Sequence, residues 1–310
     1  MTRAAIAKIL RHYDLGALLS YQSIKRGDDL QSCFIVQTAK GKFFLKQYLP
    51  FKYRHAKWGF GLMIYLQKKN YPVANVITSK RGEVCVTCDK NHFTLWEYIK
   101  ENETPKLTRR QAIELGRGLG WLHRITKDFK IRPAANYTRC RALFQKAAGY
   151  ARHSSKHTMG VMEYLKNKFS ALKVPVGQPR AVCHGEYSTE HVRLRNGKLF
   201  KVIDWDGAGR DPMFYDLGLT LTAAIQGRRI EFRLLRAIIK GYENERKLTA
   251  WEKEHLFECL LFGAPKYFCW GNDDDAVKYG QREIDTELTK TVMNGEAGFY
   301  KRLRLTLPTP

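Results

Sequence analysis

Acidic residues are scarce in this 310-residue sequence, and one long stretch contains none. The chain has 30 aspartates and glutamates against 54 lysines and arginines, which gives a formal net charge of +24. Between Leu30 and Gly82 there are ten lysines and arginines and no acid. Such a surface attracts polyanions, a group that includes nucleotides, phosphorylated substrates, RNA and anionic lipid headgroups. Charge alone does not choose among these partners, and solubility is the simpler alternative.

Long apolar runs are also absent. No segment approaches the roughly 18 consecutive apolar residues that span a bilayer. Residues 1–15 are interrupted by charged side chains and lack the continuous apolar core of a signal peptide. Hydrophobic residues make up 44% of the chain and charged residues 27%, which is typical of a globular protein. We therefore expect a cytoplasmic protein with one large domain or two lobes of about 150 residues each.

The cysteines lack the pattern of a disulfide framework. There are seven, an odd number at irregular spacing, which suits a reducing compartment. Cys85 and Cys88 form a lone C-x-x-C, but a zinc site needs two more well-placed ligands and no second C-x-x-C is present. We interpret the pair as ordinary cysteines of a β-strand, with a metal site as the alternative.

The first third of the chain has mainly the pattern of β-strands. Short runs rich in β-branched and aromatic residues, separated by turn residues, are typical of strands. The turn Thr38–Gly41 predicts a hairpin. Apolar residues at helical spacing occur here over residues 4–19 and 58–69. Strands are predicted at Cys33–Val36, Phe43–Leu45, Tyr71–Ile77 and Glu83–Cys88, and Phe93–Ile99 is a further short apolar run.

Helical patterns dominate after residue 105. The polar stretch Lys100–Pro105 is expected to be a hinge or domain boundary. Thr108 is predicted to cap a helix over Arg109–His123, because threonine is a favoured residue at that position. Further helices are predicted at about residues 138–172, 217–242 and 252–269.

One β-type region interrupts the helical part. Asn196-Gly197 predicts a tight turn between short segments at residues 181–183 and 199–203. The order of elements indicates an α+β fold. Its small β-rich lobe would comprise residues 1–100, and its larger, mainly helical lobe would comprise residues 101–310.

Two polar segments flank this region and carry the chemistry. Residues 184–191 read His-Gly-Glu-Tyr-Ser-Thr-Glu-His, and residues 203–209 read Ile-Asp-Trp-Asp-Gly-Ala-Gly. Phosphoryl transfer needs metal ions across the phosphates, a carboxylate aimed at the attacking hydroxyl and a cation near the phosphates. Glu186, His191 and Asp204 offer a carboxylate, a metal-ligand type five positions later, and a second carboxylate after the next strand.

These segments resemble the H-G-D-x-x-x-x-N and I-D-F/W motifs of the aminoglycoside phosphotransferase and choline kinase superfamily. Tyr215-Asp216-Leu217-Gly218 resembles the Y-D-L segment that follows them. The branch that the chain resembles most is type II homoserine kinase, in the same order over residues 5–275. The segments that carry this similarity are His12–Gly16, Ile24–Gly27, Thr38–Gly41 and Gly241–Glu252.

The resemblance implies a protein-kinase-like fold of two lobes, the first of which binds nucleotide. It implies an ATP-dependent transfer to a hydroxyl of a small molecule, with Mg²⁺ as the metal and Mn²⁺ as an alternative. The acceptor would be homoserine, an amino alcohol or an aminoglycoside-like compound, and an anionic acceptor would suit the net charge of +24 better than a small zwitterion.

The resemblance also assigns roles to residues of the first lobe and to Asp204. Lys46 matches the lysine that contacts the nucleotide phosphates, with an exposed edge-strand lysine as the alternative. Asp204 matches the metal-binding, catalytic aspartate, with a turn or cap residue as the alternative. Adenine would contact the backbone of the connector near Trp96, Glu97 and Tyr98.

Three departures from the family pattern leave catalysis open. Glu186 replaces the loop aspartate and adds about 1.5 Å of reach, which can cost about a hundredfold in rate; it is a base or an inert remnant. His191 replaces the loop asparagine, and it could bind a metal, contact a phosphate or only pack. Its imidazole suits zinc or manganese better than magnesium. The absence of any acid between Asp29 and Glu83 removes the helical glutamate that pairs with the lysine in the family.

Other motif residues have structural expectations. Asp216 is expected to hold the catalytic loop by accepting backbone hydrogen bonds, and His184 to brace the same loop. Asp206 could be a second metal contact, but we favour a solvent-facing acid. The segment Arg26–Asp28 would be the turn that covers the phosphates. The rival hypothesis is a catalytically impaired kinase-fold protein that binds nucleotide, RNA or another polyanion through its basic N-terminal lobe.

Overall fold

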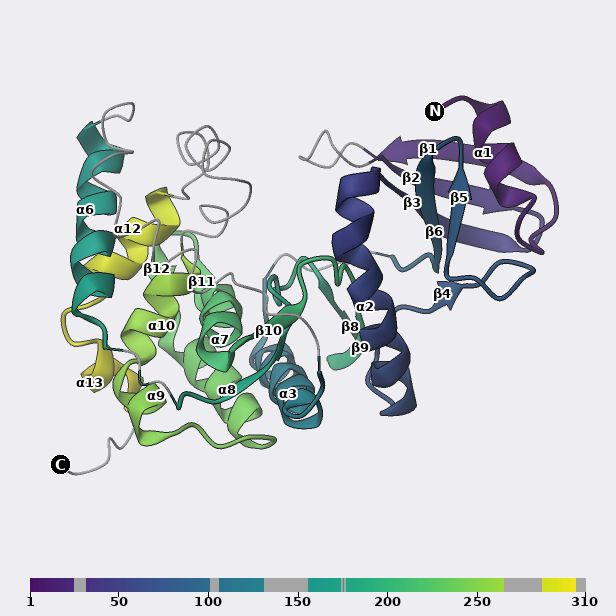
Figure 1. Ribbon diagram of the computed structural model, residues 1–310. Coiled ribbons are helices and arrows are strands. Elements are labelled where there is room, and N and C mark those ends of the chain that lie inside the picture. Colours follow the sequence, from purple (N-terminus) through teal and green to yellow (C-terminus); the bar gives the residue numbers. More distant parts are fainter. Residues whose placement is uncertain are drawn as a thin grey trace. The chain divides into compact units, whose positions relative to one another are not determined.

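The computed structural model describes residues 1–24, 32–100, 106–130, 156–173, 175, 177–264 and 286–304. The chain divides into two compact units (Figure 1). The first unit is Met1–Glu101 with Lys201–Asp206, and the second unit is Asn102–Phe200 with Gly207–Pro310. The chain therefore returns to the first unit for six residues before it completes the second. The predicted functional division into residues 1–100 and 101–310 remains a prediction.

The first unit is built on one antiparallel sheet. Its strand order is β1-β2-β3-β6-β4, and β5 also pairs with β6. Two helices, α1 (Arg3–Leu10) and α2 (Pro50–Lys68), belong to the same unit. The strands are β1 (Leu18–Ile24), β2 (Cys33–Thr38), β3 (Gly41–Tyr48), β4 (Val76–Ile77), β5 (Cys85–Cys88) and β6 (Asn91–Glu97).

Alternating burial places the core of this unit between α1 and the sheet (Figure 1). Ile6 and Ile9 of α1 are buried against Phe34 and Val36 of β2 and Leu45 of β3. These strand residues point to one face because side chains alternate along a strand. The hairpin predicted around Thr38–Gly41 is confirmed, since β2 and β3 pair with Thr38 opposite Gly41.

The returning segment Lys201–Asp206 is attached to the first unit by backbone and ring contacts. Val202 forms a parallel bridge with Val73, and its amide nitrogen lies 2.7 Å from the carbonyl oxygen of Pro72. The Trp205 indole nitrogen donates to the Val202 carbonyl, and its ring packs edge-on against Tyr71 at 6.1 Å between centroids. These contacts fix the backbone that carries the two aspartates of this segment.

The second unit is mainly helical (Figure 1). Its short strands pair as β7 with β10, β8 with β9, and β11 with β12. Its described helices are α3 (Arg109–Thr126), α6 (Lys156–Ala171), α7 (Met213–Leu221), η2 (Thr222–Ala224), α8 (Phe232–Glu243), α9 (Ala250–Glu254), α10 (Leu256–Gly263), α12 (Thr286–Asn294) and α13 (Phe299–Leu303). Its strands are β7 (Arg180–Cys183), β8 (Val192–Arg195), β9 (Lys198–Val202), β10 (Gly209–Pro212), β11 (Ile225–Gln226) and β12 (Arg229–Ile230).

Helices α3 and α8 approach each other at backbone distance. A Cβ added at Gly116 of α3 would lie 1.9 Å from the carbonyl oxygen of Ile238, and one added at Gly241 of α8 would lie 2.0 Å from that of Ile113. Only glycine leaves room for this approach. The predicted cap of α3 is confirmed, because the Thr108 hydroxyl accepts from the backbone of Gln111 in a full capping box.

Several sequence predictions were wrong in extent. The helix expected over residues 4–19 ends at Leu10 and is followed by β1. The strand expected over Tyr71–Ile77 is limited to β4. The single helix expected over residues 217–242 is two helices separated by the β11–β12 hairpin, whose turn contains Gly227 at φ 60°. A polar Gly-containing turn stops a helix even where the flanking residues are apolar.

The predicted turn at Asn196-Gly197 is confirmed, with φ values of 51° and 70°. It joins β9 to β8, a strand that the sequence pattern did not indicate. Predictions for Arg26–Asp28, most of Lys100–Pro105, residues 138–155 and residues 265–269 lie outside the described residues. Across the described ranges, no helix combines the length and apolar character needed to cross a membrane.

Candidate active site

Lys46 lies near the end of β3 and is almost completely buried. Its side chain is 9% exposed, and its ammonium nitrogen lies 2.9 Å from Oδ1 of Asp204 and 2.6 Å from Oδ2 of Asp206. Burial by itself would lower the pKa of Lys46, but the two carboxylates outweigh it and hold the pKa well above its usual value. The exposed-edge alternative for Lys46 is therefore wrong, and the residue is a buried cation between two acids of the same unit.

Asp206 does not have the solvent-facing position that we favoured from the sequence. Its side chain is 26% exposed, and both carboxylate oxygens have partners. Oδ2 contacts Lys46, and Oδ1 accepts a hydrogen bond of 3.0 Å from the hydroxyl of Tyr48. Burial raises the pKa of Tyr48 well above its ordinary value, so this phenol is a neutral donor. The lack of acids on α2 was the signal that could have identified Asp206, since a buried lysine needs a carboxylate from elsewhere.

Asp204 has a left-handed backbone conformation, with φ of 64°. This region is uncommon for residues other than glycine, although aspartate and asparagine tolerate it better than most. Such conformations are concentrated at functional sites, where the surrounding structure maintains them. The Asp204 side chain is 25% exposed, so its carboxylate combines a contact to Lys46 with access to solvent.

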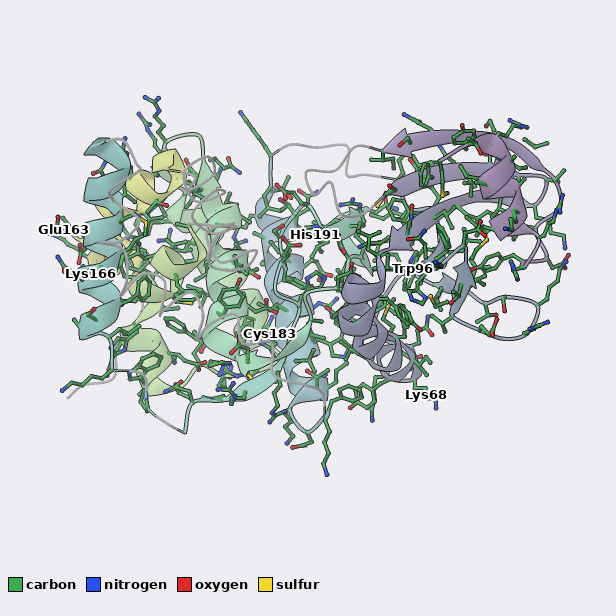
Figure 2. All side chains as sticks on the ribbon, turned by 45° about the horizontal axis from the view of Figure 1, so that its top comes forward. Lys68, Trp96, Glu163, Lys166, Cys183 and His191 are labelled. Atoms are coloured by element: carbon green, nitrogen blue, oxygen red, sulfur yellow. The ribbon has the colours of Figure 1, made fainter. Side chains whose placement is uncertain are left out.

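The predicted connector to the nucleotide base lies at the end of β6. Trp96, labelled in Figure 2, is half-buried and pairs with Phe44 of β3. Its indole nitrogen donates to the Thr94 hydroxyl at 2.8 Å. Glu97 accepts from the backbone amide of Asn75 at 2.7 Å, and its carboxylate also lies 2.6 Å from the ammonium of Lys201.

Tyr98 follows directly after β6. The Lys42 ammonium lies over its ring, 4.2 Å from the centroid. The side chains of Trp96, Glu97 and Tyr98 are thus engaged within the first unit. The backbone amide of Glu97 also donates to the Asn75 carbonyl at 2.9 Å, and the predicted nucleotide contacts of this segment remain a proposal.

The second unit holds the loop that follows β7. Asp216, in the first turn of α7, is fully buried and accepts backbone hydrogen bonds from His184 at 2.6 Å and Gly185 at 2.9 Å. The expected loop-holding role of Asp216 is confirmed by these bonds. Thr220, one turn further along α7, donates to the Tyr187 carbonyl at 2.8 Å. The loop is therefore held by α7 at several points.

His184 braces the same loop from within. Its Nδ1 atom accepts from the backbone amide of Glu186 at 3.2 Å, and its ring packs edge-on against Tyr187. Gly185 adopts φ of 89°, a conformation that a side chain would strain. The bracing role expected of His184 is consistent with these contacts.

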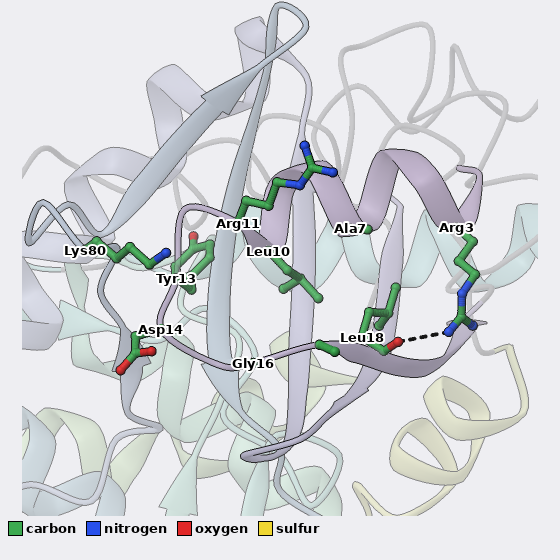
Figure 3. A pocket seen from close by; sticks show the side chains of 10 residues that line it. Arg3, Ala7, Leu10, Arg11, Tyr13, Asp14, Gly16, Leu18 and Lys80 are labelled. Atoms are coloured by element: carbon green, nitrogen blue, oxygen red, sulfur yellow. Dashed lines mark hydrogen bonds between the residues drawn. The ribbon is translucent and has the colours of Figure 1, made fainter.

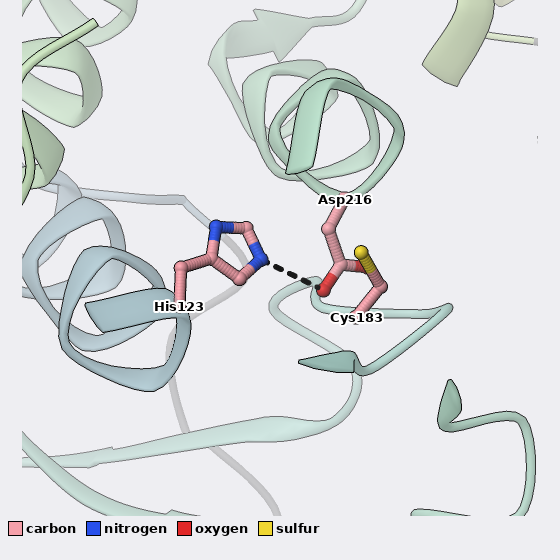
Figure 4. A group of neighbouring side chains, drawn as sticks. All are labelled: His123, Cys183 and Asp216. Atoms are coloured by element: carbon pink, nitrogen blue, oxygen red, sulfur yellow. Dashed lines mark ion pairs between the residues drawn. The ribbon is translucent and has the colours of Figure 1, made fainter. Parts of the chain in front are cut away.

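Two further residues behind the loop were not singled out from the sequence. His123 of α3 and Cys183 of β7 are buried next to Asp216, as Figure 4 shows. His123 Nε2 lies 3.5 Å from Asp216, and its Nδ1 lies 2.7 Å from the Tyr242 hydroxyl. The sequence offers only a single histidine on the apolar face of a helix, which gives no indication of these partners.

These three side chains are close enough to hold a metal ion, but their hydrogen bonds with the protein favour a structural brace. Burial lowers the pKa of His123 and raises the pKa of the Cys183 thiol well above its ordinary value. The Cys183 thiol donates to the carbonyl oxygen of Pro212 at 3.5 Å. Because both carboxylate oxygens of Asp216 also accept backbone hydrogen bonds, we assign the group to the support of the loop.

Glu186 and His191, the two substituted motif residues, contact each other. His191 Nδ1 lies 3.1 Å from the backbone carbonyl of Glu186, so this nitrogen is assigned the proton. The other ring nitrogen, Nε2, lies 3.8 Å from Oε2 of Glu186. This distance is too long for a hydrogen bond, but it leaves room for a metal cation between the nitrogen and the carboxylate oxygen. His191 is buried and Glu186 half-buried.

A separate hollow in the first unit has no predicted site residue in its lining. This cavity of about 470 Å³ lies beside α1 and includes Arg3, Arg11 and Asp14 (Figure 3). The Arg3 guanidinium donates to the Leu18 carbonyl at 2.9 Å, and Asp14 is paired with Lys40 at 2.7 Å. The Arg3 contact therefore attaches α1 to β1, and the Asp14 pair joins the loop after α1 to the turn between β2 and β3.

The C-x-x-C of the sequence lies on β5, as the strand interpretation predicted. Cys88 is buried and Cys85 half-buried, and both are free thiols. Burial raises the pKa of Cys85 to about 11, so this thiol is protonated at neutral pH when no metal is bound.

Comparison with known proteins agrees with the motif resemblance. A curated homoserine kinase of Caulobacter vibrioides is 26% identical over 285 residues, which is 88% of this chain and 89% of that protein. Neither its name nor those of the structures below refer to nucleic acid, so a nucleic-acid partner gains no support.

Two solved structures show the fold. The spectinomycin phosphotransferase APH(9)-Ia, in complex with ADP and spectinomycin, has a TM-score of 0.65 at 14% identity and covers 96% of this chain and 99% of its own. The amicoumacin kinase hAmiN, in complex with AMP-PNP and Ca²⁺, has a TM-score of 0.65 at 12% identity and covers 97% and 94%. The predicted kinase-like α+β fold is thereby confirmed.

The family is established by a match over most of the chain. The profile described as the phosphotransferase enzyme family, APH, matches residues 20–257. This range contains Lys46, the loop after β7, Asp204 and Asp216. The chain belongs to the phosphotransferase enzyme family.

Proposed function

We propose that the chain is an ATP-dependent phosphotransferase that acts on a hydroxyl of a small molecule. The acceptor is homoserine, an amino alcohol or an aminoglycoside-like compound. Family membership and the homoserine kinase relative support this function. The observation that carries it is the 2.9 Å contact of Lys46 with Asp204. It supports the proposal because phosphoryl transfer needs a cation near the phosphates and a carboxylate for a metal ion.

The donor set fits a nucleotide with a hard divalent cation. The Asp204 carboxylate is an oxygen ligand of the kind that Mg²⁺ and Mn²⁺ prefer, and it is partly exposed. Lys46 would contact the phosphates, and the backbone of Trp96–Tyr98 would contact the base. His191 adds a nitrogen ligand, which shifts the preference toward Mn²⁺. When bound, the metal neutralises charge on the phosphate oxygens.

Glu186 is the proposed base for the acceptor. A bond forms between the acceptor hydroxyl oxygen and the γ-phosphorus, the bond from this phosphorus to the bridging oxygen breaks, and ADP leaves. The hydroxyl proton passes to the Glu186 carboxylate. Asp216 accepts a hydrogen bond from the backbone of His184, and His184 accepts one from the backbone of Glu186. These bonds fix the backbone from which the Glu186 side chain extends.

Nucleotide binding and turnover test this function together. We expect ATP with Mg²⁺ or Mn²⁺ at about a hundred times its dissociation constant to raise the melting temperature by about 5 °C. ADP should then form with L-homoserine, 1-amino-2-propanol or spectinomycin as acceptor. Asp204→Asn is the matched control, which should lose turnover and keep its fold. Neither a shift nor turnover across both metals and all acceptors would refute the proposal.

A second candidate is a protein that binds nucleotide without transferring the phosphoryl group. The contact of Glu186 with His191 favours it, because the two substituted residues engage each other. The double variant Glu186→Asp/His191→Asn restores the family motif and separates the two functions. A higher turnover in the double variant supports a slow enzyme, whereas nucleotide binding without turnover in both forms supports the second candidate.

A further inference from the structure

Lys46 is a buried cation, and no acidic residue lies near it in the sequence. Helix α2, which follows its strand, contains no aspartate or glutamate, and the chain has none from Leu30 to Gly82. A buried ammonium without a carboxylate is costly. Among the described residues, the carboxylates that lie within ion-pair distance of Lys46 are those of Asp204 and Asp206.

The two aspartates are held differently. Asp206 makes the shorter contact with Lys46, 2.6 Å against 2.9 Å for Asp204. Its other oxygen accepts from Tyr48, two residues after Lys46 on β3 and therefore on the same face of the strand. One strand thus holds Asp206 through both oxygens. Asp204 instead has the left-handed backbone conformation.

A metal ion at Asp204 would change the surroundings of Lys46. A divalent cation on this carboxylate cancels its attraction for the ammonium and adds a like charge nearby. Lys46 would then need another anion to remain in place beside the phosphates. Asp206 supplies that anion, and its contact with Tyr48 keeps it directed at β3.

We propose that Asp206 is a positioning residue that holds Lys46 in place while Asp204 serves the metal. Asp206 thereby replaces an acid that helix α2 lacks. In this arrangement Asp206 holds the ammonium of Lys46, and Asp204 binds the metal ion that accompanies the nucleotide. This inference rests on the proposed nucleotide site.

A double-mutant cycle in the absence of nucleotide tests the anchoring itself. Asp206→Asn should lower the melting temperature by about 3 to 6 °C, since it leaves Lys46 with one carboxylate. In a Lys46→Met background the same change should lower it by less than about 1 °C, because the partner is gone. Asp89→Asn removes an exposed acid that pairs with Lys8 in the same unit, and it should have almost no effect.

The functional arm compares the two aspartates by their metal dependence. Asp206→Asn should raise the KM for ATP about tenfold and leave the metal concentration for half-maximal nucleotide binding unchanged. Asp204→Asn should raise that metal concentration about tenfold or more. If Lys46→Met does not fold, Tyr48→Phe gives a milder test, with an expected two- to threefold rise in KM.

Two results would overturn the proposal. Additive effects of Asp206→Asn and Lys46→Met would show that Asp206 does not act through the lysine. A metal requirement raised by Asp206→Asn as much as by Asp204→Asn would make Asp206 a metal ligand instead. If the wild-type protein binds no ATP, the proposed function fails, and the nucleotide-free cycle still decides whether Asp206 anchors Lys46.

Discussion

The two units each place an aspartate beside predicted site residues, but they surround it with different partners. Asp204 in the first unit is one-quarter exposed and pairs with the side chain of Lys46. Asp216 in the second unit is fully buried and accepts from the backbone amides of His184 and Gly185. The carboxylate of Asp204 is held by the ammonium of a flexible lysine side chain, whereas the carboxylate of Asp216 is held by backbone amides of a loop.

This difference shows how burial and partner type decide what a carboxylate can do. A lysine side chain can move to other anions when a ligand arrives, so the charge of Asp204 can be used by a metal. Buried backbone amides need a hydrogen-bond acceptor, so the charge of Asp216 is committed to holding the loop. Removal of the first should therefore affect activity, and removal of the second should affect stability.

The largest effect is expected from Asp204→Asn. Loss of a metal-binding charge should lower kcat by about a thousandfold or more, a loss of about 4 kcal/mol of transition-state stabilisation. Stability should stay within about 1 kcal/mol, because asparagine tolerates the left-handed conformation and Lys46 keeps its contact with Asp206. Steady-state kinetics and urea unfolding measure the two quantities. A loss of several kcal/mol in stability would place Asp204 with Asp216 as a structural residue.

Asp216→Asn is expected to reverse this balance. The asparagine keeps one acceptor oxygen and turns an amide group toward a backbone N–H, which leaves a buried donor without a partner. The free energy of unfolding should fall by about 2 to 4 kcal/mol. Chemical unfolding measures the loss, and Asp14→Asn, which removes an exposed partner of Lys40, is the matched control. A variant that keeps wild-type stability and loses only turnover would contradict the assignment.

The sequence identified Lys46 and Asp204 as site residues, but it did not predict the residues that surround them. Lys46 and Asp204 were assigned by resemblance to a family motif, although 158 positions separate them. No local pattern predicts such a contact, because it depends on the return of Lys201–Asp206 to the first unit. Asp206 was misplaced since its partner Tyr48 is equally distant in the sequence.

The second arrangement was predicted only in part. Asp216 and the loop after β7 belong to motifs of the same family, and the hydrogen bonds between them were predicted. His123 and Cys183 come from different elements, α3 and β7, and only the packing of these elements brings them to Asp216. The hairpin β11–β12 was missed for a local reason, since its short strands resemble continued helix and only Gly227 marks the turn.

The smallest expected effect is a pH dependence of stability that comes from His123 in the second unit. Burial lowers the pKa of His123 below its ordinary 6.5, against the opposing influence of Asp216. The unfolded chain therefore binds a proton before the folded protein does. Stability is fully present above pH 6.5 and falls as the pH drops toward the lower folded value, by at most about 1.4 kcal/mol per unit.

His123→Asn should reduce the fall in the free energy of unfolding below pH 6.5. Urea unfolding between pH 7.5 and 5.5 measures the slope, and asparagine keeps a polar group near the Tyr242 hydroxyl. His92→Asn in the first unit is the control, because burial lowers the pKa of His92 as well, but this ring contacts Thr87 and Tyr53 and has no part in the support of the loop after β7. An equal loss of slope in both variants would mean that the acid sensitivity does not come from the brace behind the loop. A loss confined to His123→Asn would show that the charge of Asp216 is balanced by hydrogen bonds rather than by a protonated histidine, the opposite of the balance between Asp204 and Lys46.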